Sequence, residues 1–216
     1  ARVTFEGITL KMSSTTQRWT EYEKMKLRVT GANFTARGML IDGSAAAGVY
    51  VGGATYFRFD NCRVQNTRAD GIFISEGSAH GVLTGCIADT TGDDGFSVVS
   101  YDGAPVHHVT NIGARVMNSQ ARGMSVVGGS DITYTGFTIN TTVAAGLYLG
   151  TENDTYEDTL RVSISAGTII NANTDAGTGH GAVLIITDGT HTTSGIDING
   201  VNIRDTPGTA PRVIGI

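Results

Sequence analysis

The chain has 216 residues, of which 40% are hydrophobic, and its mean hydropathy is close to zero. This length and composition suit one domain with a continuous core. The formal net charge of −5 argues against a nucleic-acid partner, because phosphate binding needs a clustered basic surface. No apolar stretch approaches the roughly 18 residues of a membrane-spanning helix, so we expect no membrane insertion. Thirty Gly against three Pro are typical of many short strands joined by turns.

A motif of two short β-type stretches separated by a turn residue returns eight times along the chain. Gly or Asn occupies the turn, because these residues adopt the left-handed backbone conformation more readily than others. The spacing from one turn to the next lies between 23 and 33 residues, which is typical of a solenoid. The predicted turn residues are Gly7, Gly31, Asn61, Gly85, Gly113, Gly136, Gly167 and Gly200.

A third β-type stretch follows an Ala-Gly, Asp-Gly or Arg-Gly step in most periods. These stretches begin at Gly48, Gly71, Gly95, Gly123, Gly146 and Gly181. Three short strands per turn with alternating apolar side chains predict an all-β fold, a right-handed parallel β-helix of about eight coils over residues 1–216. The chain opens in mid-coil and ends on RVIGI, which is similar to a first strand, so we expect one domain that is a segment of a longer polypeptide.

Several features outside the strand repeat have a structural interpretation. Cys62 and Cys86 follow the turn residue in consecutive coils, so we expect two stacked, buried thiols rather than a disulfide. Trp19 lies in a long insertion that we expect to fold as a short helix over one coil. The acidic run of Glu152, Asp154, Glu157 and Asp158 is interpreted as a solvated turn rather than a Ca²⁺ site.

Acidic and basic residues gather in one column of the predicted solenoid. Aligning the coils at the Gly before the third strand stacks the preceding residues about 4.8 Å apart. The column reads Ala47, Asp70, Asp94, Arg122, Ala145 and His180. Asp93 precedes Asp94, so three carboxylates and one guanidinium meet within two coil steps. Mutual repulsion raises the pKa of at least one carboxyl in such a cluster, which makes Asp70, Asp93, Asp94 and Arg122 catalytic candidates.

The residues that alternate with the core positions of the third strands predict a sugar-binding groove. If the apolar residue after each Gly points inward, the next residue points outward on one face. Aromatic residues on either side of two serines would offer stacking walls and a floor of small residues for a sugar. The predicted substrate-binding residues are Tyr50, Phe73, Ser97, Ser125 and Tyr148, with Tyr101 just past the strand.

The stretches NTRADGIFISEGS, TTGDDGFSVVSYDG and NSQARGMSVVGGS resemble three consecutive coils of the pectin-lyase-like β-helix superfamily. They are most similar to polygalacturonase-type glycoside hydrolases and to related repeat proteins of microbial and phage origin. The resemblance places Asp70 at the first Asp of the polygalacturonase pattern and Asp93 with Asp94 at its Asp-Asp pair. Arg122 stands where that family has His, and the basic Arg-Ile-Lys motif that grips uronate is missing.

The resemblance implies an inverting glycoside hydrolase that acts on a polysaccharide. The similarity to polygalacturonases in particular implies an acidic polysaccharide. Asp94 or Asp93 would be the acid, Asp70 the base or a partner in holding water, and Arg122 an orienting group. No cofactor is needed for that reaction, and we expect an extracellular protein.

Two alternatives use the same residues. A pectate-lyase-like enzyme would bind Ca²⁺ through the Asp cluster and use Arg122 as the base. A non-catalytic tail fibre or tailspike segment on a virion surface would bind a polysaccharide receptor, and we would then expect a homotrimer.

Overall fold

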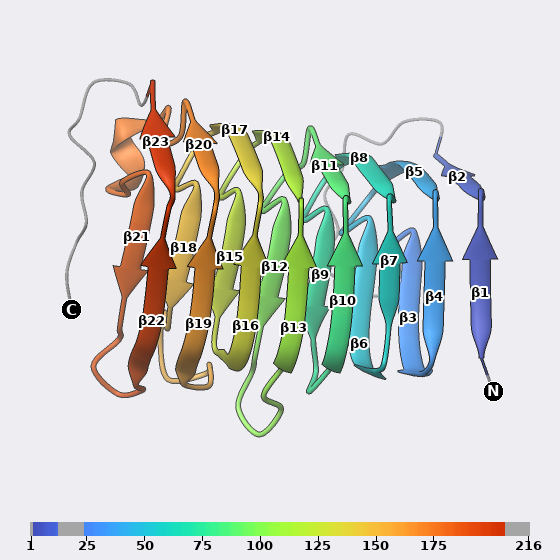
Figure 1. Cartoon of the computed structure of the whole chain (residues 1–216), viewed down its shortest axis with the longest axis horizontal. Helices are drawn as coiled ribbons and strands as arrows, with labels where there is room; N and C mark the ends of the chain where they lie inside the picture. The colour runs from blue at the N-terminus through green and yellow to red at the C-terminus, as the bar shows by residue number, and fades with distance from the viewer. Residues whose placement is uncertain (1, 13–23, 206–216) are drawn as a thin grey trace.

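The computed structural model describes residues 2–12 and 24–205. The predictions for Trp19 and for the C-terminal RVIGI segment fall outside these residues. The described chain is a right-handed parallel β-helix whose strands form three faces along one axis (Figure 1). The predicted fold class is therefore confirmed. No helix among the described residues combines the length and apolarity needed to cross a membrane.

Each face is a ladder of parallel strands from successive coils. The first face contains β1 (Val3–Glu6), β4 (Phe34–Arg37), β7 (Arg58–Asp60), β10 (Ala79–Thr84), β13 (His107–Ile112), β16 (Gly129–Thr135), β19 (Thr159–Ser165) and β22 (Thr193–Asn199). The second face contains β2 (Thr9–Lys11), β5 (Leu40–Ser44), β8 (Arg63–Thr67), β11 (Ile87–Asp89), β14 (Arg115–Ser119), β17 (Thr138–Thr142), β20 (Thr168–Ile170) and β23 (Asn202–Arg204).

The third face contains β3 (Leu27–Ala32), β6 (Val49–Thr55), β9 (Ile72–Ser75), β12 (Phe96–Val99), β15 (Met124–Val127), β18 (Leu147–Gly150) and β21 (Val183–Ile186). It joins the first face where the end of β6 pairs with β10, so the two form one 15-stranded sheet. A short 3-10 helix, η2 (Ala176–Thr178), precedes β21. This third face positions the candidate site described below.

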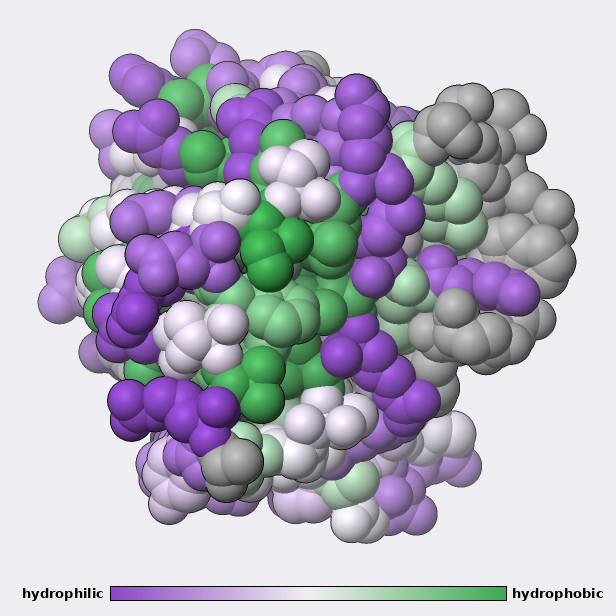
Figure 2. Space-filling model, turned by 90° about the vertical axis from the view of Figure 1, so that its right-hand side faces the viewer, coloured by the Kyte–Doolittle hydropathy of each residue, from purple (hydrophilic) through white to green (hydrophobic). Residues whose placement is uncertain are grey.

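The core fills the space between the three faces with stacked apolar side chains. Val49, Ile72, Phe96, Met124 and Leu147 are all buried there, as the alternation predicts. Cys62 and Cys86 are buried free thiols of the same core, which confirms their predicted role. Figure 2 looks onto the end at which β1 lies, where hydrophobic residues gather in the middle of a hydrophilic rim. Phe5, Ile8 and Leu10 pack against the core at this end.

The turn residues were predicted correctly in most coils and wrongly in two. The turn of the second coil lies at Gly38, with φ of 55°, whereas Gly31 is part of β3. LRVTG has the same apolar alternation before Gly as a true turn, although it belongs to the third face. Between β19 and β20, Ala166 rather than Gly167 has the positive φ.

The predicted alignment of the last coil is shifted by one residue. Leu147 pairs with Val183, and the N–H of Gly146 donates to the carbonyl of Ala182. His180 therefore lies one residue before the position in the column that the sequence predicted.

Glycine precedes the third-face strands β6, β9, β12, β15 and β18 because the coils approach closely there, not because of an unusual φ. A Cβ on Gly95 would lie 2.6 Å from the Val116 side chain and 2.7 Å from the carbonyl oxygen of Gly123. Gly71, Gly123 and Gly146 meet the corresponding atoms of their neighbouring coils. The Gly that follows Asp70, Asp94 and Arg122 thus packs the coil tightly against the second face and fixes where those three residues stand.

We expect Gly95→Ala to lower the free energy of unfolding by about 1–3 kcal/mol, since the added methyl overpacks the junction of two faces. The measurement is denaturant unfolding of the variant beside the wild type. Gly177→Ala is the matched control, because its Cβ would meet only the end of the exposed Asp175 side chain and its φ is not positive. Equal losses in both variants would contradict the proposed packing role.

Candidate active site

The column of charged residues predicted from the repeat is present at the start of the third face. Asp70, Asp94 and Arg122 directly precede the Gly that leads into β9, β12 and β15. The Gly71 N–H donates to the carbonyl of Asp94 at 2.9 Å, and the Gly95 N–H donates to the carbonyl of Arg122 at 3.1 Å. These bonds set the three residues in register on adjacent coils, which confirms that acids distant in sequence become neighbours.

Asp94 is held by three hydrogen-bond donors. The backbone N–H of Arg122 donates to Asp94 Oδ1 at 2.9 Å. Ser125 Oγ donates to Asp94 Oδ2 at 2.6 Å, and the Arg122 guanidinium lies 3.3 Å from the same oxygen. Burial raises the pKa of Asp94 to about 6, although Arg122 lowers it. Both oxygens of this carboxyl are therefore oriented and supported in the charged form near neutral pH.

Asp70 has a different environment, with one described donor. Ser97 Oγ donates to Asp70 Oδ1 at 2.7 Å. Burial, followed by the carboxylates of Asp94 and Asp93, raises the pKa of Asp70 to about 8. Ser97 and Ser125 are register partners on β12 and β15, so each supports one carboxyl of the stacked pair. Between pH about 6 and 8, Asp70 and Asp94 together carry one proton.

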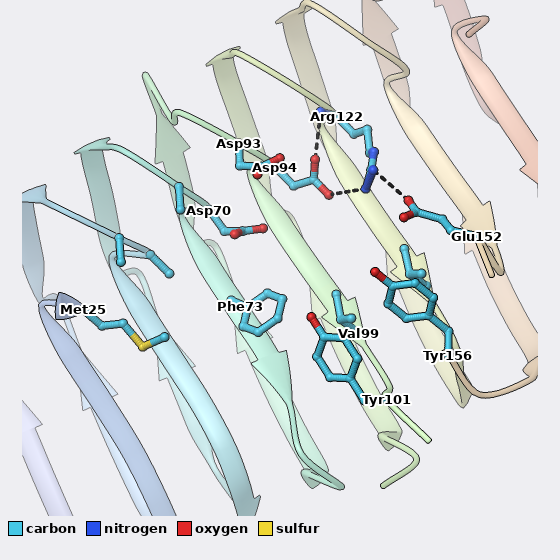
Figure 3. A pocket seen from close by; sticks show the side chains of 14 residues that line it. Met25, Asp70, Phe73, Asp93, Asp94, Val99, Tyr101, Arg122, Glu152 and Tyr156 are labelled. Carbon is cyan, nitrogen blue, oxygen red and sulfur yellow. Dashed lines mark hydrogen bonds and ion pairs between the residues drawn. The ribbon is translucent and has the colours of Figure 1, made fainter. Parts of the chain in front are cut away.

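Asp93 lies beside this pair with its backbone fixed from both sides. The hydroxyls of Thr91 and Ser119 each donate to the Asp93 carbonyl at 2.7 Å, and the Asp93 N–H donates to the carbonyl of Ala69 at 3.2 Å. The side chain is partly exposed and lies near the Asp70 and Asp94 carboxyls (Figure 3). A fixed backbone with a partly exposed carboxyl suits a group that meets a bound ligand.

Arg122 is enclosed by groups that keep it charged. Its guanidinium lies 2.8 Å from Glu152 Oε1 and 4.2 Å from the centre of the Tyr148 ring. Burial lowers the pKa of Arg122, but the carboxylates of Asp94 and Glu152 more than offset this, so its pKa is raised. A guanidinium held between two carboxylates and an aromatic face stays charged, which suits an orienting cation better than a proton acceptor.

These residues line one pocket of about 300 Å³ on the third face (Figure 3). The acidic residues and Arg122 form one side of the pocket, whereas Phe73 and Val99 form an apolar part. The remaining lining residues are Met25, Ala46, Ala47, Ala69, Tyr101, Val127, Glu152 and Tyr156. A pocket with a few convergent polar groups and an apolar wall is suited to a sugar chain.

The predicted outward face is largely covered, which corrects the sugar-binding role assigned to four residues. Tyr50, Ser97, Ser125 and Tyr148 are at most 4% exposed. Tyr50 stacks on Phe73 at 5.3 Å, and Tyr148 lies beneath the guanidinium of Arg122. The two serines support the carboxyls instead of facing a ligand. Their neighbours on adjacent coils cover them, which alternation within one strand does not reveal.

Two of the predicted substrate-binding residues do line the pocket, and three further residues join them. Phe73 and Tyr101 are in the pocket wall together with Met25, Glu152 and Tyr156, which the sequence interpretation missed. Glu152 was assigned to a solvated turn, but it forms the ion pair with Arg122 described above. The signal that could have found it is the lengthened period after β18, since an insertion beside the charged column can reach over it.

Within the described parts of the chain, no three His, Cys, Asp or Glu side chains are arranged to hold a metal ion. The pectate-lyase-like alternative would need several carboxylate oxygens that converge on one Ca²⁺ ion. Here both oxygens of Asp94 already accept hydrogen bonds from Ser125 and Arg122. The Asp94 carboxyl is thus engaged by Ser125 and Arg122 rather than open to a metal ion.

A family model described as "Alpha-1,3-glucanase catalytic domain D2" matches residues 41–183, about two thirds of the chain. The chain belongs to this family. The match covers every acidic and basic residue of the pocket. Among curated proteins, no significant sequence match is found for this member of the glucanase domain family.

Solved structures similar to this glucanase-family chain share its fold. The catalytic unit of a thermostable GH87 alpha-1,3-glucanase from Streptomyces thermodiastaticus has a TM-score of 0.75 at 20% identity, over 89% of this chain and 37% of that chain. A GH87 alpha-1,3-glucanase catalytic-domain variant in complex with tetrasaccharides has a TM-score of 0.70 at 22% identity, over 80% of this chain and 34% of that chain. This chain therefore spans about a third of the length of these glucanase structures.

A more distant structural neighbour is an alginate lyase from a Paenibacillus species. It has a TM-score of 0.55 at 14% identity, over 84% of this chain and 74% of that chain. At this identity the likeness concerns the fold alone. The expected pectin-lyase-like superfamily is confirmed, and within it the matching family model is that of the glucanases.

Proposed function

We propose that this chain carries the catalytic pocket of a glycoside hydrolase that cleaves alpha-1,3-glucan. The observation that carries the proposal is the meeting of Asp70, Asp93 and Asp94 in one pocket on a chain of the alpha-1,3-glucanase domain family. Among the described residues that line the pocket, Arg122 is the one cation, and it is already paired with Asp94 and Glu152. A neutral glucan fits this charge distribution better than an acidic polysaccharide.

The spacing of three aspartates in a solved relative supports the choice of residues. GH87 alpha-1,3-glucanase structures with bound sugars include three variants, each with one aspartate of that enzyme replaced by alanine. The second of these aspartates follows the first by 23 residues, and the third comes directly after the second. Asp70, Asp93 and Asp94 have the same spacing in this chain.

The stacked pair of Asp70 and Asp94 is the proposed water-holding base. With the pKa of Asp94 at about 6 and that of Asp70 at about 8, a charged Asp94 can accept a proton from water and a neutral Asp70 can donate a hydrogen bond to that water. Ser97 and Ser125 orient the two groups, and Arg122 keeps a charge on Asp94. The pair therefore orients a water molecule for attack on the sugar carbon, with the charged carboxylate removing its proton.

Asp93 is the proposed general acid. Inverting hydrolysis needs a second carboxyl group that protonates the glycosidic oxygen while the base activates water on the opposite face of the sugar. Asp93 is adjacent to the pair, partly exposed and fixed at its backbone. The glycosidic bond would lie between Asp93 and the water, and the proton from Asp93 leaves with the departing sugar hydroxyl.

The test is the incubation of the protein with alpha-1,3-glucan and with oligogalacturonide, with release of reducing ends as the readout. We expect cleavage of the glucan alone, with the new reducing end first appearing as the β anomer by NMR, since inversion converts the α bond. An unsaturated product absorbing near 235 nm would indicate a lyase instead. Binding without any cleavage would favour a non-catalytic polysaccharide-binding module, and no action on glucan would contradict the proposal.

A further inference from the structure

Two loops of different coils meet above the third face next to the pocket. One loop, residues 100–106, follows β12, and the other, residues 151–158, follows β18. The coil between them has almost no loop, because only Gly128 separates β15 from β16. The two long loops therefore reach across a coil that leaves room for them.

Hydrogen bonds join these two loops into one unit. The Asp102 N–H donates to the carbonyl of Thr155 at 3.0 Å, and the Glu157 N–H donates to the carbonyl of Ser100 at 3.0 Å. Glu157 Oε1 accepts a hydrogen bond from the Gly103 N–H at 2.6 Å. A Cβ on Gly128 would lie 2.8 Å from the Glu157 carbonyl oxygen, so the short turn fits only as glycine beneath the joined loops.

The joined loops hold two tyrosines in a stack on the pocket wall. The rings of Tyr101 and Tyr156 lie 5.3 Å apart with an interplanar angle of 27°, and an isolated backbone bridge links the two residues. Both residues line the pocket that contains the carboxyl cluster (Figure 3). Tyr156 packs against the buried cluster that includes Val99, Val127 and Tyr148, whereas Tyr101 is 38% exposed. One ring is thus anchored and the other is presented to solvent.

This arrangement suits a pyranose ring better than a charged or extended apolar ligand. The C–H faces of a sugar pack on aromatic rings, and the ring faces of this stack offer such a surface without any need for their hydroxyl groups. The rings are held before any ligand arrives, so a sugar binds there at little cost in ordering. One loop belongs to the coil of Asp94, and the other belongs to the coil two steps further toward the C-terminus. The pocket wall formed by Tyr101 and Tyr156 therefore extends the pocket toward the C-terminal coils.

We propose that Tyr101 and Tyr156 form a stacking platform for a sugar unit beyond the two that flank the cleaved bond, so that the substrate chain runs along the helix axis toward the C-terminal coils. This inference rests on the proposed glucanase function and identifies how that site would hold a chain longer than a disaccharide. It adds Tyr156, a residue outside the repeat pattern, to the binding surface.

The test uses a catalytically impaired Asp93→Asn parent and measures calorimetric affinity for an alpha-1,3-linked glucose disaccharide and tetrasaccharide. We expect Tyr156→Ala to weaken tetrasaccharide binding about tenfold, because a stacked ring surface is lost. Disaccharide affinity should change much less. Tyr156→Phe should bind as the parent does. Tyr56→Ala is the matched control, since Tyr56 is 61% exposed and stacks on His80 outside the pocket.

Tyr101→Ala serves as the second variant, because its more exposed ring contributes less to the fold. Tetrasaccharide affinities equal to that of the parent in both alanine variants, with unchanged melting temperatures, would overturn the platform. In that case cleavage of glucan by the wild-type protein would leave the proposed function standing. A parent that binds no tetrasaccharide, together with a wild type that cleaves no glucan, would overturn both proposals.

Discussion

Replacing Asp93 with Asn is expected to lower kcat for alpha-1,3-glucan hydrolysis by about 10²–10⁴-fold, the usual contribution of a positioned general acid. The amide has the size of the carboxyl but cannot give its proton to the glycosidic oxygen. The backbone bonds from Thr91 and Ser119 do not involve the side chain, so the local fold should persist. Reducing-end assays over a range of glucan concentrations would separate the effect on kcat from that on KM.

An aryl glucoside with a good leaving group separates the role of Asp93 from that of the stacked pair. Such a leaving group needs little protonation, so Asp93→Asn should retain much more of its activity on this substrate than on glucan. Asp94→Asn should be impaired on both, because water activation is required in either reaction. Asp131→Asn is the control, since Asp131 forms a surface ion pair with Arg161. Equal losses on both substrates in Asp93→Asn would exclude the acid role.

The position of the acidic column could be predicted from the sequence, because residues at equivalent positions of consecutive repeats stack on one another in a solenoid. The Asp-Gly and Arg-Gly steps mark equivalent positions in three successive coils, and parallel pairing then fixes Asp70, Asp94 and Arg122 as neighbours. No other information is needed once the period is recognised. The same logic placed Cys62 and Cys86 correctly in the core.

What lies outside the repeat could not be derived in this way. Glu152 and Tyr156 come from an inserted loop, whose path over the third face depends on contacts with a second loop two coils earlier. Met25 also lies outside the repeated strands, and no period relates it to the pocket. The insertions that shape the pocket wall are therefore the parts that sequence periodicity leaves undetermined.

Residues within the repeat were misjudged where burial depends on neighbouring coils. Alternation correctly gives the direction of Ser97 and Tyr148 relative to the core, yet both are buried. Long neighbouring side chains such as Arg122 cover the outward face. Gly31 was misassigned because a Gly after alternating apolar residues occurs both in turns and within β3.

Replacing Asp70 with Asn is expected to abolish hydrolysis and to stabilise the protein at neutral and alkaline pH. The native pKa of Asp70 is raised to about 8, above the ordinary value of 3.8. As pH rises from about 4 to about 8, the unfolded chain loses this proton while the native chain keeps it. The unfolded state then binds fewer protons than the native state, so the stability of the wild type falls across this window.

Asn resembles the protonated carboxyl at every pH and can still accept the hydrogen bond from Ser97. The variant therefore lacks the loss of folding stability that the wild type shows as pH rises. The melting temperatures of variant and wild type should agree near pH 4 and diverge as pH rises toward 8. We expect Asp70→Asn to melt about 4–8 °C higher at pH 8, equivalent to about 2 kcal/mol after allowance for partial solvent exposure.

Asp131 is the control residue, because its pKa is shifted in the opposite direction from that of Asp70. Arg161 lowers the pKa of Asp131 to about 2, so any stability that this carboxylate contributes is present above pH about 4 and lost only as pH falls toward 2. The difference between Asp131→Asn and the wild type should therefore stay constant from pH 5 to 9. A difference for Asp70→Asn that is equally constant over this range would mean that Asp70 is charged in the native state, and the neutral carboxyl of the proposed water-holding pair would be absent.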